Sequence, residues 1–180
     1  MQRFTEKLGP LKSLFKEGSW LKEILFAVVI WLLITTAVGE ARVVPSGSME
    51  PTIQVGDRIW TDKLLLRFSP VQRGDIIVFD PPIPSPDPYI KRLIGLPGEQ
   101  IEVRQGKVFV NGQPLQETYI AEKPDYNYGP VTVPADQYLM LGDNRNHSYD
   151  SHYWGMVSKD KIRSRAMFRF WPLDRIGAVK

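Results

Sequence analysis

Hydrophobic and polar positions follow two different patterns along the chain. Residues 24–38 form its only long apolar run, and this run contains no charged residue. Beyond it, apolar residues come in short β-rich runs between turn-forming residues, which is typical of strands. These runs predict strands over residues 58–60, 75–79, 101–103, 107–110 and 138–141. The pattern predicts a mainly β fold, an all-β domain of short strands preceded by one N-terminal transmembrane helix.

Turn-forming residues mark the boundaries of these predicted strands. Asn111-Gly112 follows the run at residues 107–110, and both residue types tolerate the positive φ of a type I′ turn, so a β-hairpin is expected there. The segment from Asp80 to Pro88 contains five prolines in nine residues. Proline cannot donate to a strand ladder, so this segment is predicted to be a loop at the rim of the domain.

The apolar run predicts a membrane anchor when it is extended to residues 20–39, because a helix of this length is about 30 Å long and matches a bilayer core. More basic residues precede this segment than follow it, which keeps the N-terminus cytoplasmic in a single-pass protein; they are Arg3, Lys7, Lys12, Lys16 and Lys22. Residues 1–19 are then a cytoplasmic basic amphipathic segment on the membrane surface, or alternatively a solvated tail. Residues 40–180 form the extracytoplasmic domain.

A cleavable signal peptide is the competing interpretation of the N-terminus. Ala37-Val38-Gly39 places small residues at the spacing that a cleavage site requires. However, the leading region is long and carries Glu6, Glu17 and Glu23 among its lysines. These features favour an uncleaved anchor.

Composition narrows the possible chemistry. The chain has 180 residues, a formal net charge of +3 and no cysteine, which excludes disulfides, thiolate metal sites and a cysteine nucleophile. Its basic residues are mostly dispersed, and Arg163, Arg165 and Arg169 alternate with other residues like the solvent face of a strand, so nucleic acid is not expected as a partner. Neither histidine belongs to a metal-binding motif, and we expect no metal and no cofactor.

A candidate nucleophile lies just after the apolar run, in Pro45-Ser46-Gly47-Ser48-Met49-Glu50-Pro51-Thr52. Ser46 and Gly47 allow a sharp turn that exposes Ser48 and a backbone amide beside it. Pro51 prevents a helix from continuing through the turn. Pro, Ser and Gly are also the usual residues of an ordinary surface turn, so this segment alone does not separate the two interpretations.

Two kinds of base are available to Ser48. His147 and His152 lie in a polar loop and permit a Ser-His-Asp arrangement. Lys91 is the preferred candidate, because it lies in a mostly apolar predicted strand where burial would lower the pKa of its amine. Strand alternation places Tyr89 and Lys91 on one face and Ile90 on the other, and it does not decide which face is buried.

Three segments considered together resemble type I signal peptidases. They are Ser46 to Thr52, then Tyr89-Ile90-Lys91-Arg92 with Gly95-Leu96-Pro97-Gly98, and finally Gly142-Asp143-Asn144-Arg145-Asn146-His147-Ser148-Tyr149-Asp150-Ser151. The order of the three segments and the anchor before the serine make the combination specific. The form of the last segment resembles the members from cyanobacteria and chloroplast thylakoids.

The resemblance implies a mainly β fold with an antiparallel β-sheet catalytic domain. It also implies a membrane-anchored serine endopeptidase that removes signal peptides from exported preproteins, with Ser48 as nucleophile and Lys91 as general base. It implies that the Ser48 amide and the Ser46 hydroxyl stabilise the oxyanion, that Ser148 orients the lysine amine and that Asp150 supports the loop. The remaining implied roles are structural ones for Gly142, Asp143, Asn144 and Arg145, and the lining of small-residue pockets by Val44, Tyr89 and Ile90.

The expected partners are the signal peptides of preproteins and the lipid bilayer, in a plasma or thylakoid membrane, downstream of the export translocon. The sequence departs from many bacterial members at His152, where they carry arginine, which leaves the role of Asp150 open. Two alternatives compete with this hypothesis. One is a noncatalytic membrane-anchored β module that binds peptides, and the other is a self-cleaving repressor-type protease, for which no DNA-binding helix pair is present.

Overall fold

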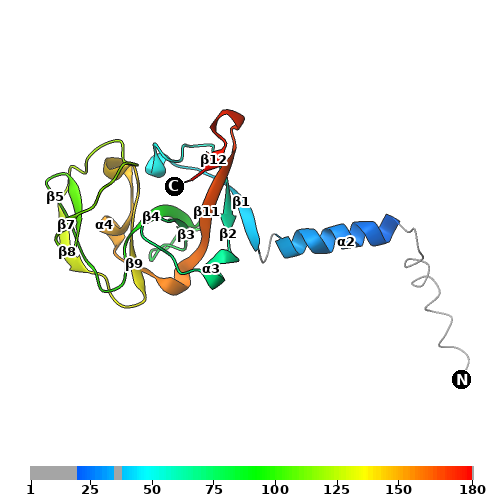
Figure 1. Cartoon of the computed structure of the whole chain (residues 1–180), viewed down its shortest axis with the longest axis horizontal. Helices are drawn as coiled ribbons and strands as arrows, with labels where there is room; N and C mark the ends of the chain where they lie inside the picture. Colours follow the sequence, from blue (N-terminus) through cyan, green and yellow to red (C-terminus); the bar gives the residue numbers. More distant parts are fainter. Residues whose placement is uncertain (1–19, 35–37, 180) are drawn as a thin grey trace, which may run out of the picture. The chain divides into compact units, whose positions relative to one another are not determined.

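Short strands with few polar positions form the centre of the fold, as the sequence pattern predicts. The computed structural model describes residues 20–34 and 38–179. Antiparallel pairing joins all the strands of residues 39–179, and the expected hairpin is present, because Asn111 and Gly112 have φ values of 50° and 77° between two paired strands. The mainly β, antiparallel prediction is therefore confirmed (Figure 1).

The larger sheet has eight strands in the order β1-β2-β11-β3-β4-β9-β10, with β12 paired to β11. Its central strands β3 and β9 are almost wholly buried, in keeping with their apolar runs, and β4 is buried from Lys91 to Gly95 although it carries Lys91 and Arg92. The bounds of its strands are Gly39–Val43 (β1), Arg58–Asp62 (β2), Ile76–Phe79 (β3), Tyr89–Gly95 (β4), Gln137–Leu141 (β9), Val157–Ser158 (β10), Ile162–Trp171 (β11) and Gly177–Ala178 (β12).

The smaller sheet has four strands in the order β7-β6-β5-β8. They are Gln100–Arg104 (β5), Lys107–Val110 (β6), Gln113–Pro114 (β7) and Tyr128–Thr132 (β8). A core cluster joins the two sheets, because Ile101 and Val108 of the smaller sheet pack with Ile94, Leu139 and Leu141 of the larger one. This packing fixes the smaller sheet against strands β4 and β9 of the larger sheet.

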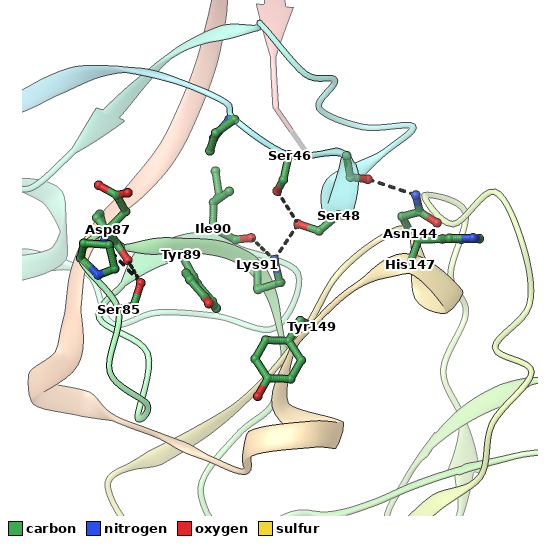
Figure 2. Close-up of a pocket in the computed structure, with 14 residues that line it drawn as sticks. Ser46, Ser48, Ser85, Asp87, Tyr89, Ile90, Lys91, Asn144, His147 and Tyr149 are labelled. Carbon is green, nitrogen blue, oxygen red and sulfur yellow. Dashed lines mark hydrogen bonds between the residues drawn. The ribbon is translucent and has the colours of Figure 1, made fainter.

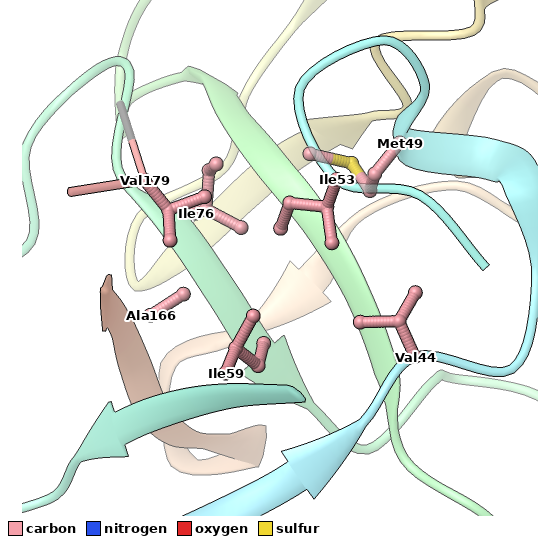
Figure 3. Close-up of a cluster of buried hydrophobic side chains, with 7 residues drawn as sticks. All are labelled: Val44, Met49, Ile53, Ile59, Ile76, Ala166 and Val179. Atoms are coloured by element: carbon pink, nitrogen blue, oxygen red, sulfur yellow. The ribbon is translucent and has the colours of Figure 1, made fainter. Parts of the chain in front are cut away.

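A second core cluster anchors the turn that carries Ser48. Met49 and Ile53 are fully buried and pack with side chains of the larger sheet (Figure 3); the other members are Val44, Ile59, Ile76, Ala166 and Val179. The 3-10 turn η3 (Gly47–Met49) is thus held in the core by the side chain that follows the serine. Burying one Met side chain stabilises such a turn by about 1.5–3 kcal/mol.

The helices of the described residues are α2 (Trp20–Leu33), α3 (Leu65–Phe68) and α4 (Ser151–Trp154). Helix α2 belongs to a separate unit of the chain, has no buried residue and presents apolar side chains on all sides. None of the helices within the described ranges combines the length and hydropathy that a bilayer crossing requires. The predicted anchor over residues 20–39 extends past α2 to include Gly39, the first residue of β1, and residues 1–19 and 35–37 lie outside the described ranges.

Candidate active site

The two predicted reactive side chains meet at the edge of the core. Lys91 lies on β4 opposite Ile77 of β3, and its Nζ is 2.6 Å from the Oγ of Ser48 (Figure 2). The same Nζ donates a hydrogen bond of 3.1 Å to the carbonyl oxygen of Ile90. Lys91 is 4% exposed and Ser48 is 7% exposed. Lys91 is therefore buried, as are the following residues of β4 on both faces of the strand, which strand alternation alone did not decide.

Burial sets the proton affinity of the lysine. Loss of hydration lowers the pKa of Lys91 from 10.5 to about 8, while the carboxylates of Asp150 and Asp143 oppose this effect. A substantial fraction of the amine is then neutral in a mildly alkaline solution. Only the neutral amine has the free electron pair that accepts a proton from a hydroxyl.

Ser46 also lies beside Ser48, with 3.4 Å between the two Oγ atoms. Ser148, which the resemblance expects to orient the lysine amine, is buried, and its Oγ has no hydrogen-bond partner among the residues that the structure describes. Ser148 packs instead beside Gly142, where a Cβ atom would lie 2.2 Å from the Ser148 Oγ and 2.4 Å from the Ser48 carbonyl oxygen.

Asp150 is fully buried and holds the loop that follows β9. It caps the N-terminus of α4, and its Oδ2 accepts a 2.8 Å hydrogen bond from the Gly142 amide. Its Oδ1 lies 2.7 Å from the Nδ1 of His152, whose ring stacks on Tyr126 with 4.2 Å between the ring centroids. His152 thus contacts the aspartate directly, in the position where an arginine was expected from the resemblance.

Neither histidine pairs with the serine. The described hydrogen bonds of the Ser48 Oγ involve only Lys91 and Ser46. His152 contacts Asp150, and His147 lines the cavity in front of the serine. The residues of the site therefore form a Ser-Lys arrangement and not a Ser-His-Asp arrangement.

Two ion pairs lie behind Ser48 and Lys91. Arg92 donates to both carboxylate oxygens of Asp143 at 2.8 and 2.7 Å, and both side chains are at most 2% exposed. Arg145 donates to both carboxylate oxygens of Glu117 at 2.9 and 2.6 Å and to the Gly142 carbonyl oxygen at 3.0 Å. These bidentate pairs fix the Gly142 to Arg145 segment against the back of the site.

Sequence reasoning missed Glu117 and the neighbouring Tyr119. Both lie in the segment that connects β7 and β8, two strands of the smaller sheet. This segment carries no recognisable motif. Tyr119 donates to Glu117 at 2.7 Å, and the Arg92 guanidinium lies 3.9 Å from the centroid of its ring. An acidic residue beside an aromatic one gives no signal of such a contact before the two sheets are packed together.

Two neighbouring cavities lie in front of the reactive side chains. The larger has a volume of about 560 Å³ and is lined by Ser48, Lys91 and the proline-rich loop, among others. The smaller has a volume of about 250 Å³ and is lined by Val44, among others. Tyr89 and Ile90 line both cavities, whereas Val44 lines only the smaller one, which Ser48 and Lys91 do not line.

Comparison with known proteins supports a hydrolytic site. Residues 18–171 match the family described as "Signal peptidase, peptidase S26". The chain is 52% identical over 171 residues to the "Probable signal peptidase I-2" of Synechocystis sp., covering 91% of this chain and 78% of that relative. It is 52% identical over 166 residues to the "Signal peptidase I" of Leptolyngbya laminosa, covering 88% and 82%. It is also 37% identical to "Thylakoidal processing peptidase 1, chloroplastic" of Arabidopsis thaliana, covering 87% and 49%.

Proposed function

The chain belongs to the signal peptidase family, peptidase S26, and we propose that it removes signal peptides from preproteins with Ser48 as nucleophile and Lys91 as general base. The observation that carries this proposal is the 2.6 Å contact between the Lys91 Nζ and the Ser48 Oγ. A buried lysine with a lowered pKa is an effective base for a serine hydroxyl. The enzyme is a serine endopeptidase of the Ser-Lys type.

In the first step, the neutral amine of Lys91 takes the proton of Ser48 as the Oγ attacks the carbonyl carbon of the scissile peptide bond. Negative charge develops on the carbonyl oxygen, and the Ser48 amide and Ser46 hydroxyl donate hydrogen bonds to it. The lysine ammonium then gives its proton to the leaving nitrogen. The mature protein leaves with a free amino group, and the signal peptide remains as an ester on Ser48.

In the second step, a water molecule enters the position left by the amine. Lys91 is neutral again after its proton transfer, so it takes a proton from this water as the oxygen attacks the ester. The tetrahedral intermediate then collapses, and the Lys91 ammonium returns the proton to the departing Ser48 oxygen. The signal peptide leaves as a free carboxylic acid, and one water molecule is consumed.

Specificity follows from the cavity walls. Tyr89 and Ile90 line both cavities, and Val44 lines the smaller one. Apolar walls of this kind admit small side chains and exclude large ones by contact. We therefore expect cleavage after small residues, in an A-x-A-like sequence.

Membrane attachment is the second part of the proposal. Helix α2 exposes large apolar side chains, including Phe26 at 68% and Trp31 at 61%. Such a surface is unfavourable in water and favourable in lipid. We propose that residues 20–39 anchor the enzyme in the plasma or thylakoid membrane, with residues 1–19 cytoplasmic and residues 40–180 on the far side, downstream of the translocon. Asp150 supports the site loop in this scheme.

Processing of a purified preprotein in detergent or vesicles tests the proposal. Ser48→Ala and Lys91→Ala should each abolish release of the mature protein without loss of folding. Lys107→Ala, which changes an exposed lysine on β6, should process the preprotein at the wild-type rate. Processing that persists in Ser48→Ala refutes the mechanism, and a wild-type protein that binds signal peptides without cleaving them would be a noncatalytic peptide-binding module.

A further inference from the structure

The direction of the Ser48 amide depends on the carbonyl group that precedes it. A peptide unit is planar and trans, so the Gly47 carbonyl and the Ser48 N–H lie in one plane and point in opposite directions. Any group that fixes the Gly47 oxygen therefore also fixes the direction of the Ser48 N–H. In the mechanism proposed above, on which this inference rests, that N–H must point at the developing oxyanion.

The Gly47 carbonyl oxygen accepts two hydrogen bonds. The Glu50 amide donates one at 3.1 Å and closes the local 3-10 turn. The Asn144 side-chain amide donates the other, also at 3.1 Å, from a loop that is 97 positions away in the sequence (Figure 2). With the local hydrogen bond alone, the peptide plane between Gly47 and Ser48 could still rotate about the line that joins their Cα atoms. The second hydrogen bond, which comes from another element, restrains this rotation.

Asn144 also contacts the other side of the nucleophile. Its backbone amide donates a 3.1 Å hydrogen bond to the Ser48 carbonyl oxygen. One residue therefore holds the peptide groups on both sides of Ser48. We propose that Asn144 is a positioning residue that aligns the Ser48 N–H for stabilisation of the oxyanion.

The surroundings of Asn144 allow it to do this. Its neighbour Asp143 is fixed by Arg92, and its neighbour Arg145 is fixed by Glu117, in the two buried ion pairs described above. An amide that is held at both flanks needs no rearrangement when charge develops in the site, which is the condition for effective electrostatic stabilisation. The hydrogen-bonding role also requires a donor, and the side-chain amide of asparagine supplies one.

Asn144→Ala and the matched control Asn146→Ala test the proposal in the full-length enzyme. Alanine removes the side-chain bond from residue 144 and leaves its backbone amide in place. Asn146 lies in the same loop, but its side-chain amide donates to Lys123 and Glu122, away from Ser48. On a peptide that spans a cleavage site, Asn144→Ala should lower kcat by about tenfold to a hundredfold, with little change in KM. Asn146→Ala should retain the wild-type kcat.

A second measurement isolates the oxyanion. A signal-peptide aldehyde adds the Ser48 O–H across its C=O bond, and the resulting hemiacetal oxygen occupies the oxyanion position. The matching peptide alcohol binds the same cavities without this addition. Asn144→Ala should therefore lose affinity for the aldehyde by about tenfold or more, while its affinity for the alcohol stays unchanged. The ratio of the two affinities does not depend on the fraction of folded enzyme.

The outcomes separate the two proposals. If Asn144→Ala keeps the wild-type kcat and aldehyde-to-alcohol ratio, or if both asparagine variants lose kcat equally, Asn144 is not a positioning residue. The pH at which kcat/KM reaches half its maximum should be the same in wild type and Asn144→Ala, and a shift would mean that the substitution acts on Lys91. Wild-type-like processing by Ser48→Ala would instead overturn the catalytic proposal itself.

Discussion

The Nζ of Lys91 lies 2.6 Å from the Oγ of Ser48 although 43 positions separate the two residues in the chain. Strand β4 carries the lysine, and a turn anchored in the core by Met49 carries the serine. The strand belongs to the larger sheet and the turn packs against that sheet, so their relative positions depend on core packing and not on a flexible loop. This rigidity is what a reaction between two side chains requires.

The pH dependence of cleavage should follow Lys91. Because its pKa is lowered to about 8 and only the neutral amine accepts a proton, kcat/KM should rise with pH and reach half of its maximum near pH 8. Initial rates on a peptide substrate between pH 6 and pH 10 measure this. A rate that stays constant across this range would contradict the assignment of Lys91 as the base.

Lys91→Met should stabilise the fold while abolishing cleavage. The pKa of Lys91 is 10.5 when unfolded and about 8 when folded, so the charged form is disfavoured in the fold. At pH 7, removing this buried charge should raise the free energy of unfolding by up to about 3 kcal/mol.

The pH dependence of the stability difference between Lys91→Met and the wild type provides a control. As pH rises from 8 toward 10.5, folded Lys91 loses its proton while the unfolded chain keeps it, so the wild type gains stability. The advantage of Lys91→Met should therefore shrink at pH 10. Urea unfolding of both proteins at pH 7 and pH 10 measures it, and an advantage that grows with pH would contradict the burial of a charged lysine.

Gly142→Ala should inactivate the enzyme through a steric clash. The added Cβ would lie 2.2 Å from the Ser148 Oγ and 2.4 Å from the Ser48 carbonyl oxygen, so one of them must move. We expect kcat to fall by about a hundredfold, because a displacement of about 1 Å in a catalytic group costs that much. Gly112→Ala, at a glycine with open space around the new atom, should leave kcat unchanged although its positive φ makes alanine strained.

The buried ion pair of Arg92 and Asp143 should show a strong coupling in the free energy of unfolding. Arg92→Met leaves the Asp143 carboxylate buried without its main counter-charge, which should cost about 3–5 kcal/mol of unfolding free energy. The double variant Arg92→Met with Asp143→Leu should lose less than the sum of the two single changes. Urea unfolding of the four proteins gives the coupling energy, and simple additivity would show that the two side chains act independently.

Ile90→Ala should broaden substrate choice. The Ile90 side chain lines both cavities, and shortening it enlarges the space for the residue before the cut. Cleavage after Val relative to cleavage after Ala should increase by about tenfold in kcat/KM. Ile176→Ala, at a 58% exposed isoleucine, is the matched control and should keep the wild-type preference. An unchanged preference in Ile90→Ala would remove this side chain from the specificity walls.

Local patterns in the sequence were sufficient for much of the fold. The strand at residues 107–110 and its Asn111-Gly112 turn occur where they were predicted, because turn geometry and the alternation of side chains act over a few residues. Strand β1 was not predicted, since Gly39 and Glu40 carry no strand signal. The pairing of β1 with β2 brings the Thr61 carbonyl oxygen very close to Gly39. A Cβ atom added at Gly39 would lie 2.3 Å from this oxygen, so only glycine fits at this position.

Sequence patterns alone showed which residues are available for chemistry, namely a serine in a sharp turn and a lysine in a mostly apolar strand, and the family resemblance connected the two. That Lys91 is buried follows only from the packing of the folded chain, because the period of a strand assigns residues to faces without showing whether one face or both are covered. The same packing brings Asn144, Arg145 and Glu117 into contact with one another or with the nucleophile turn, whereas the Ser148 Oγ has no hydrogen-bond partner within the described ranges. These contacts join segments far apart in the chain, and they exist only after the two sheets have packed against each other.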